Sequence, residues 1–503
     1  MVRPGPGRPL GSRLVGGAAP APRRAVRAGT RGPRLVPRPQ PRDDRPHDAR
    51  ARRTPPPPHV RPVRAAATPP WADVRDPAGA GRVADRHRAS LDGDTTADVV
   101  VVGAGATGLW TAYYLLEADP AIDVLVVDAS TVGEGASSRT TGWCAARFPV
   151  ATETLASRYG AAAARELRAA LRDTVVEVGG VTAAEEIACD FAYGGHLVLA
   201  RTPAQSARLA EAVASARRWD DEVEPLDADE AGTHLRAAGT RTAAWTPDSA
   251  RVQPRALATG LARVVEQRGV RVAERTRVLR VSPRAVVTDQ GTVRCRHVVH
   301  ATGATPPGVP GTGRAGAATD AVAIATEPLP APVWHELGLA HGTTFSVASR
   351  RAVHGHRSAD DRLVLTARAG APAPSGAHAR LRAALVDLFP SLATRAVTHA
   401  WRWPLDVARD GYASVGVDPA AGLAWTHGHA EDGTALANLA GRTLADLLTG
   451  TSSALTRLPW VGHRSPAWPP GPAATAMLTA AAWRAAWSDR TEQPASRPRT
   501  SRG

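Results

Sequence analysis

The first clear hydrophobic pattern lies at residues 97–102, where ADVVVV forms a short and almost continuous apolar run. Such a run is typical of a parallel strand that is buried on both faces. The glycine-rich stretch GAGATG follows at residues 103–108, and LWTAYYLLE at 109–117 favours a helix. A second apolar strand at 124–127 ends in Asp128. This order predicts a βαβ unit with a glycine turn between its first strand and its helix.

Each glycine of this turn has a physical role in binding a dinucleotide. Gly103 permits the tight turn, Gly105 lets the backbone approach a pyrophosphate, and Gly108 allows close packing of helix on strand. Ala106 and Thr107 begin the helix, where free N–H groups and the positive dipole end favour phosphate. We therefore expect a dinucleotide site here rather than a plain βαβ turn.

The end of the second strand selects among dinucleotides. Asp128 is placed to accept hydrogen bonds from ribose hydroxyls, with Ala129 beside it. A carboxylate at this point also repels a 2′-phosphate. The site is therefore expected to favour FAD or NAD over NADP.

The next segment, GEGASSRTTGWC at residues 133–144, is rich in small and hydroxyl side chains. A nicotinamide dehydrogenase would normally continue here with another crossover. The segment instead predicts a loop whose backbone approaches the cofactor, and its candidate cofactor residues are Ala136, Ser137, Arg139, Thr141, Gly142 and Trp143. Arg139 either neutralises pyrophosphate charge or forms a salt bridge within the loop. Trp143 either lines the substrate pocket or packs in the core.

At this loop the chain resembles the FAD-dependent amine and amino-acid oxidoreductases of the D-amino-acid oxidase/glycine oxidase superfamily. It is most similar to the branch that contains gamma-glutamylputrescine oxidoreductase, whose loop typically has the sequence GEGASGRNGGW. Here Ser138 replaces a glycine, and Thr140 and Thr141 replace Asn-Gly. The resemblance extends over roughly residues 91–490 and implies non-covalent FAD, since no cysteine follows Cys295.

Three later segments agree with the resemblance. The stretch VVHATGA at 298–304 is an apolar strand that ends in small residues, and GHAEDGT at 428–434 precedes a helix at 435–447. By analogy, the backbone of residue 278 meets the adenine, and the helix directs its N-terminus at the flavin N1–C2=O region. The implied cofactor residues here are Val278, Ala301, Gly303, His429, Glu431, Asp432, Gly433 and Thr434.

The resemblance implies an α/β fold with two interleaved domains. A Rossmann-type FAD-binding domain is assembled from residues 95–150, 250–310 and 405–450. A mixed β-sheet substrate domain of α+β type is assembled from 151–249 and 311–404. Residues 451–490 form a helical tail, and residues 1–90 and 491–503 are expected to be disordered.

Family members transfer a hydride from the carbon beside an amine to flavin N5, and the imine then hydrolyses. Amino-acid oxidases hold the substrate carboxylate with an arginine just before a proline, and here that position is Trp403 with Arg402 beside it. A small amine substrate is therefore favoured over an amino acid. The catalytic residues stay unknown, with Trp403, Arg402 and Trp143 as candidates. The acceptor is oxygen or another compound, because the chain has no lysine to activate oxygen.

Two alternatives stay open: a flavoprotein that binds FAD without turnover, and a flavin dehydrogenase that uses an acceptor other than oxygen. His427, His429, Glu431 and Asp432 are interpreted as cofactor-turn residues rather than metal ligands, so no metal is expected. The sequence His354-Gly355-His356 is interpreted as a surface hairpin, and Cys144 as a packing residue rather than a nucleophile.

The high net charge does not alter the expected fold or function, because most of it lies in the N-terminal segment. The formal charge is +15, but residues 1–90 hold 20 Arg against 6 Asp and no Glu, together with 18 of the 43 prolines. A segment of this composition buries too little apolar surface to fold. The remaining chain is nearly balanced, so no nucleic-acid partner is expected. No apolar run has the length of a membrane helix or a signal peptide, and the default expectation is a cytoplasmic protein.

Overall fold

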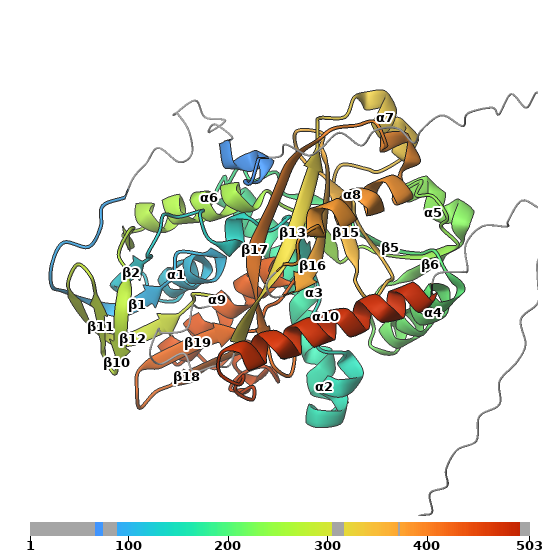
Figure 1. Ribbon diagram of the computed structural model, residues 1–503. Coiled ribbons are helices and arrows are strands. Elements are labelled where there is room, and N and C mark those ends of the chain that lie inside the picture. The colour runs from blue at the N-terminus through green and yellow to red at the C-terminus, as the bar shows by residue number, and fades with distance from the viewer. Residues whose placement is uncertain (1–65, 74–87, 304–315, 371–372, 493–503) are drawn as a thin grey trace, which may run out of the picture. The chain divides into compact units, whose positions relative to one another are not determined.

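The computed structural model describes residues 66–73, 88–303, 316–370 and 373–492. Within these residues no helix has the length and apolar character that crossing a bilayer requires. The described strands form two large sheets and a small one, and helices pack against them (Figure 1).

The first sheet contains the predicted βαβ unit. Its strands are β1 (Thr95–Val102), β2 (Val124–Val127), β9 (Arg271–Ala273), β10 (Val278–Ser282), β11 (Ala285–Thr288), β12 (Thr292–His300), β18 (Ser414–Asp418) and β19 (Leu423–His427). The strand order is β10-β11-β12-β1-β2-β9, and β19 joins β18 to β12. Strands β12, β1, β2 and β9 run parallel. Val99, Val100 and Val101 are fully buried, as the continuous apolar run predicts.

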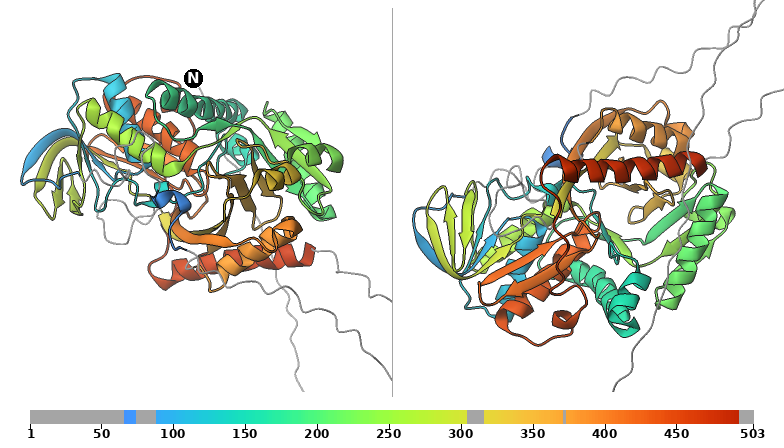
Figure 2. Two further views of the ribbon diagram at one scale, coloured as in Figure 1. Left: turned by 90° about the horizontal axis from the view of Figure 1, so that it is seen from above. Right: turned by 60° about the horizontal axis from the view of Figure 1, so that its bottom comes forward.

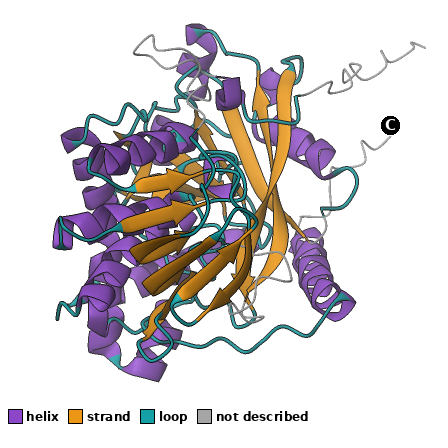
Figure 3. Cartoon of the chain, turned by 90° about the vertical axis from the view of Figure 1, so that its left-hand side faces the viewer, coloured by secondary structure: helices purple, strands orange, loops and turns teal. Residues whose placement is uncertain are grey.

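Four helices pack beside this sheet: α1 (Ala106–Ala118), α3 (Ala161–Ala184), α6 (Pro254–Gln267) and α9 (Gly433–Thr449). Helices α1 and α9 lie side by side although they are far apart in the sequence. Gly441 permits this approach, because a Cβ there would lie 2.7 Å from the backbone of Trp110. In Figure 3 a stack of helices lies to the left of the strands, and further helices lie to the right.

The second sheet is mixed, as the predicted substrate domain requires. Its strands are β5 (His196–Ala200), β6 (Glu224–Leu226), β7 (Thr242–Thr246), β13 (Gly316–Thr326), β14 (Thr344–Val347), β15 (Val353–Arg357), β16 (Leu363–Gly370) and β17 (Val397–Ala408). The order is β17-β13-β16-β15-β14-β5-β7-β6. Only the pair of β14 and β5 is parallel among these described strands. The first sheet, with parallel strands at its centre, and the mixed second sheet confirm the predicted α/β fold class.

The second sheet has two unlike faces. On one face Phe345, Leu365 and Ile324 form an apolar core with α5 (Ala228–His234), α7 (Ala331–Leu337) and α8 (Ala377–Leu388). Helix α4 (Pro203–Arg218) packs on a smaller cluster near β5 and β7. The other face is called the pocket face below, and it carries His196, Thr344, Ser346, His354, His356, Thr366, Arg368, Ala321, Trp401 and Trp403.

A three-stranded sheet of β3 (Trp143–Ala145), β8 (Ser249–Arg251) and β4 (Ala192–Tyr193) follows the predicted cofactor loop. Helix α2 (Thr152–Tyr159) precedes α3, which the sequence analysis placed in the substrate domain. The structure differs here, because Leu167, Leu171 and Val175 of α3 share one core cluster with α1 and α9. The apolar stripe of α3 therefore belongs with the first sheet. The other domain boundaries stay predictions.

The expectation of disorder through residue 90 is wrong for residues 66–73 and 88–90. The 3-10 helix η1 (Pro70–Asp73) buries Trp71, and Ala66 pairs with His399 of β17. Arg88 forms ion pairs with Glu266 and Glu274. Burial of one large aromatic ring anchors a segment whose composition alone predicts no fold. The rest of the predicted leader, and residues 493–503, lie outside the described residues.

Helix occupies only the second half of the predicted helical tail at 451–490, because most of residues 451–471 are outside helices. After the 3-10 helix η4 (Leu455–Arg457), helix α10 (Pro472–Glu492) lies alongside the second sheet (Figure 2). Glu492 pairs with Arg208, and the Asp489 carboxylate accepts hydrogen bonds from the backbone N–H groups of Arg350 and Arg351. Two further 3-10 helices are η2 (Ala136–Ser138) and η3 (Pro390–Leu392).

Candidate active site

The glycine turn after β1 is tightly packed on its own backbone. Gly103 has a φ of +109°, and a Cβ there would lie 2.7 Å from the carbonyl oxygen of Ala301. At Gly108 a Cβ would lie 1.9 Å from the carbonyl oxygen of Gly103. At Gly105 it would meet the Ser137 hydroxyl at 3.0 Å. Only glycine fits at residues 103 and 108, which brings β1, α1 and the end of β12 together.

Ser137 and Asp128 close this turn from the side. The Ser137 hydroxyl accepts a hydrogen bond from the Ala106 backbone N–H at 3.0 Å, at the N-terminus of α1. The Asp128 carboxylate accepts from the backbone N–H groups of Ala104, at 2.7 Å, and Ser130, at 2.8 Å. Burial raises the pKa of Asp128, and these two backbone hydrogen bonds oppose that shift. The carboxylate is therefore fixed in position beside the glycine turn.

A cavity of about 490 Å³ extends from this turn toward the second sheet. Twenty-nine described residues line it, and most of them are glycine, alanine, serine or threonine. Those predicted from sequence are Gly103, Gly105, Ala106, Thr107, Asp128, Ala129, Ala136, Ser137, Val278, Ala301, Gly303, Trp403, His429, Gly433 and Thr434. Gly108 does not line the cavity, because it packs against the backbone of Gly103. Sequence reasoning missed Thr276, Pro254, Leu257 and Asp406, which also line the cavity.

The predicted cofactor loop divides into lining and supporting residues. Arg139 has an exposed side chain that lines none of the described pockets and forms no described ion pair, while its carbonyl accepts a hydrogen bond from the Trp401 indole at 2.8 Å. Gly142 has a φ of +75°, and a Cβ there would lie 1.7 Å from the carbonyl oxygen of Val252. Thr141 is buried at the edge of a second, smaller pocket.

This second pocket, of about 50 Å³, adjoins the first and shares with it the lining residues Thr140, Trp403, Leu405, Ala430, Gly433 and Thr434. It lies on the pocket face of the second sheet and is called the inner pocket below. Its other lining residues are Thr141, Trp143, Ala321, His354, Thr366, Ala367, Arg368 and Glu431. Trp143 is thus a pocket residue, and its indole N–H donates to the Ser249 hydroxyl at 3.0 Å.

The two candidates on β17 point to opposite sides, as neighbours on a strand do. Trp403 is 4% exposed and borders both pockets. Arg402 is exposed, borders neither pocket and pairs with Asp320 at 3.6 Å. The prediction of Arg402 as a catalytic candidate is therefore wrong, because the strand alternation turns its side chain away.

The turn before α9 brings charged groups to the inner pocket. Glu431 pairs with Arg368 at 3.2 Å. Burial alone would raise the pKa of Glu431, but Arg368 and its neighbours hold that pKa below its ordinary value. Asp432 is buried and pairs with Arg147 at 3.5 Å. It lines neither the larger cavity nor the inner pocket. His429 borders the larger cavity, and its ring is held by the Thr426 hydroxyl at 2.8 Å.

Residues 98–447 match the family described as DAO, FAD dependent oxidoreductase. The chain belongs to this family. FAD is its cofactor, and the chain is an FAD-dependent oxidoreductase.

Two curated relatives agree with this assignment. Gamma-glutamylputrescine oxidoreductase of Escherichia coli is 30% identical over 42% of this chain and 50% of its own length. The match thus spans half the length of that relative. The probable oxidoreductase OrdL of Haemophilus influenzae is 24% identical over 72% of this chain and 84% of its own length.

Solved structures share the fold. Glycine oxidase from Geobacillus kaustophilus superposes with a TM-score of 0.60, at 22% identity over 73% of this chain and 99% of its own. L-proline dehydrogenase from P. horikoshii superposes with a TM-score of 0.61, at 16% identity over 73% of this chain and 96% of its own.

The residues present fit FAD. The turn at Gly103 and Gly108 is a backbone cradle that a Cβ would fill, and the Asp128 carboxylate beside it would accept hydrogen bonds from a ribose. Gly433 and Thr434 at the N-terminus of α9 also line the cavity, and the positive end of this helix would stabilise negative charge on a bound flavin. Cys144, Cys189 and Cys295 are buried outside the cavity, and burial raises the pKa of the Cys144 thiol to about 12. None of the three is placed to attach the flavin.

Sequence reasoning missed two pocket histidines. The interpretation of His354-Gly355-His356 as a surface hairpin is wrong, because all three residues are buried in β15 at the centre of the second sheet. Polar residues at every second position, here His354 and His356 on either side of Gly355, are typical of a strand with one polar face, and this pattern could have indicated β15. Trp71 and Asp406 carried no comparable signal in the sequence.

Proposed function

We propose that the chain oxidises the carbon–nitrogen bond of a small amine or amino-acid derivative. Bound FAD supplies the acceptor, at N5, for the hydride that leaves the carbon beside the nitrogen. The resulting imine takes up water and releases a carbonyl compound and the amine or ammonia. The observation that supports this best is the direct contact between the FAD cavity and the inner pocket at Trp403, Gly433 and Thr434.

The inner pocket excludes water by packing. Trp143 and Trp403 are 9% and 4% exposed, and Leu405 is also buried. The Trp143 ring stacks on the His196 ring at 4.7 Å and contacts the His354 ring in a tilted arrangement at 4.6 Å. Rings held in this way orient a C–H bond without taking part in proton transfer, which suits a reaction that depends mainly on positioning.

The charges of the pocket favour an amine that enters uncharged. Arg368 is paired with Glu431, and Arg147 lies 5.1 Å from the Trp143 ring centre and is paired with Asp432. Both guanidinium groups therefore have a carboxylate partner. Trp403 stands at the position where amino-acid oxidases have the arginine that binds a substrate carboxylate. A plain amine therefore suits the pocket better than an amino acid.

The test is anaerobic bleaching of the flavin absorbance in the purified full-length protein. Putrescine derivatives, sarcosine and glycine are added one at a time, and we expect the amines without a carboxylate to bleach the flavin fastest. Peroxide formation in air then distinguishes oxygen from another acceptor. A yellow protein that none of the amines reduces would contradict the proposal and favour a binding protein without turnover.

A further inference from the structure

Two histidines of β15 border two neighbouring pockets. His354 borders the inner pocket, and His356 borders an outer pocket of about 300 Å³. Residues two apart on a strand face the same side, so both rings lie on the pocket face, with their β carbons about 7 Å apart. Gly355 faces the opposite side, where a Cβ would lie 2.4 Å from the Phe345 ring. The apolar core behind the strand thus fixes which side the histidines face.

His354 is 8% exposed, and neither of its ring nitrogens has a hydrogen-bond partner in the described part of the chain. His196 on the same face differs, because its two ring nitrogens contact the Thr344 hydroxyl at 2.8 Å and the Ser346 hydroxyl at 2.9 Å. Buried polar groups in native proteins are normally paired. The unpartnered nitrogens of His354 beside the inner pocket therefore point to a ligand, and His356, which is 5% exposed, lies next to them on the same face.

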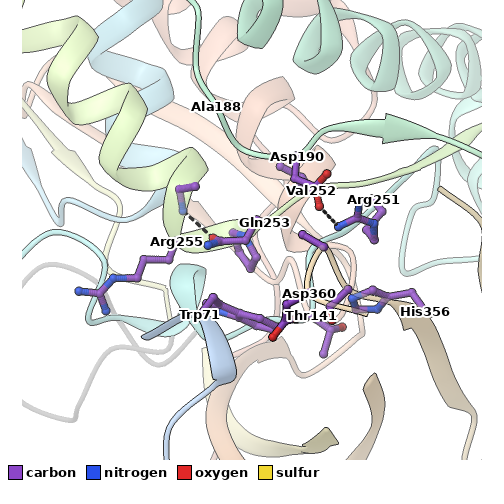
Figure 4. Close-up of a pocket in the computed structure, with 14 residues that line it drawn as sticks. Trp71, Thr141, Ala188, Asp190, Arg251, Val252, Gln253, Arg255, His356 and Asp360 are labelled. Carbon is purple, nitrogen blue, oxygen red and sulfur yellow. Dashed lines mark hydrogen bonds and ion pairs between the residues drawn. The ribbon is translucent and has the colours of Figure 1, made fainter. Parts of the chain in front are cut away.

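The outer pocket adjoins both parts of the active site. Thr141 borders the outer and the inner pocket, and Pro254 borders the outer pocket and the FAD cavity. Figure 4 shows Trp71, Thr141 and His356 along the lower side of the outer pocket, with Arg251 above. Thr141 is the one described residue that lines both the outer and the inner pocket, so a molecule that spans the two histidines would contact it.

The charged groups around the outer pocket have partners of their own. Arg251 pairs with Asp190 at 2.5 Å (Figure 4). It also donates to the His341 carbonyl at 3.1 Å. Asp360 pairs with Arg362 at 2.5 Å. A further guanidinium, that of Arg255, extends away from the other labelled side chains and donates to the Gly133 carbonyl. The outer pocket thus suits a polar group without charge.

We propose that His354 and His356 bind the two ends of one elongated amine, with the reacting nitrogen at His354 and an uncharged hydrogen-bonding group, such as an amide, at His356. This inference rests on the proposed function. An imidazole carries one donor and one acceptor, which match the N–H and C=O of an amide. A short amine such as glycine reaches only the first histidine.

Both imidazoles are neutral near pH 7, which suits uncharged partners. Burial lowers the pKa of His354 to about 4; Glu431 opposes this shift, while Arg147 and Arg368 add to it. Burial lowers the pKa of His356 to about 3, with Arg251 and His341 adding to the shift. A neutral ring gives a carboxylate tail no charge to pair with.

The experiment compares four amines of similar length that differ in the remote group: δ-aminovaleramide, hexylamine, δ-aminovalerate and cadaverine. Their dissociation constants are measured by calorimetry on the full-length FAD-loaded protein, and flavin bleaching is followed separately. We expect δ-aminovaleramide to bind about tenfold more tightly than hexylamine, the value of one or two hydrogen bonds. Tighter binding of δ-aminovalerate or cadaverine than of the amide would overturn the inference.

Variants assign the preference to one side chain. In His356→Phe the ratio between the amide and hexylamine should fall to about one, and His356→Gln, which keeps a donor and an acceptor, should restore part of it. His335→Phe changes an exposed histidine and should keep the wild-type ratio. Equal weakening of all four amines in His356→Phe would show a structural role only and contradict the inference.

The two proposals fail separately. A preference for the amide that depends on His356, without bleaching by any amine, would overturn the proposed function and leave the binding site. Bleaching by short amines without such a preference would leave the function and overturn the site. If none of the four amines binds, both proposals fall.

Discussion

The FAD cavity and the inner pocket are built by different means. Short turns that follow β1, β2 and β12 bound the cavity, and they line it with small residues such as glycine at 103 and 105. The inner pocket is bounded by side chains that alternate along β15, β16 and β17, such as His354, Arg368 and Trp403. Backbone cradles require a few residue types at fixed spacing, whereas a side-chain pocket can be made from almost any sequence. One region is therefore easily identified in a sequence and the other is not.

The largest effect is expected at the residue that joins the two regions. Trp71 is buried, donates from its indole N–H to the Ser138 carbonyl of the cofactor loop at 2.8 Å, and packs edge-on against Trp401 of β17 at 5.4 Å. Trp71→Ala should lower the free energy of unfolding by about 4 kcal/mol, because it leaves a large cavity. Chemical denaturation measures this change.

Trp483 on α10 is the matched control, because it is 74% exposed. Trp483→Ala should change the free energy of unfolding by less than about 0.5 kcal/mol. Equal effects of the two substitutions would show that residues 66–73 do not contribute to the fold.

The next test challenges the cradle itself. Gly108→Ala places a Cβ 1.9 Å from the Gly103 carbonyl oxygen, so the turn must move. We expect a loss of about 3 kcal/mol of stability and protein that purifies without flavin. Flavin absorbance per chain and thermal unfolding measure both.

Gly180→Ala is the same substitution in helix α3, where a Cβ meets nothing within 4 Å. It should stabilise the protein by up to about 1 kcal/mol, since alanine is the better helix former. If the Gly108→Ala variant retained its flavin, this would contradict the inference that the backbone turn at Gly103 and Gly108 holds FAD.

The sequence predicted the cofactor region in detail because its requirements are local. Gly103, Gly108 and Asp128 lie within one βαβ unit, and each had a recognisable role. The inner pocket was predicted only through Trp143 and the segment around Trp403. His354 and His356 depend on which face of β15 meets the core, and that is decided by Phe345 on another strand. Trp71 is a single aromatic residue in a proline-rich segment, so only its tertiary contacts reveal its role.

A pH test compares the buried imidazoles of the two regions. His300 ends β12 and is 5% exposed, its ring has no described hydrogen-bond partner, and burial lowers its pKa to about 4. The unfolded chain binds a proton below about pH 6.5 and the folded chain only below about pH 4, so acid favours unfolding in this window. Relative to His300→Phe, the wild type should lose about 3 kcal/mol between pH 6.5 and 4.

Denaturant midpoints across this pH range measure the difference, with His335→Phe as the exposed control. His354→Phe should likewise reduce the loss of stability between pH 6.5 and 4. It should also weaken amine binding. A His300→Phe variant with the wild-type pH profile would show that folding does not lower the pKa of His300.

The smallest expected effect isolates one hydrogen bond of the cavity. The Ser137 hydroxyl accepts from the Ala106 N–H at the start of α1, a position where a lost cap costs about 1 kcal/mol. Ser137→Ala should cost that amount and should leave the flavin bound, because the cradle consists of backbone and glycine rather than hydroxyl groups. Ser157→Ala, an exposed serine of α2, should cost less. If Ser137→Ala instead released the flavin as completely as Gly108→Ala, then side chains would matter in the FAD cavity as much as in the inner pocket, and the contrast between the two regions would fail.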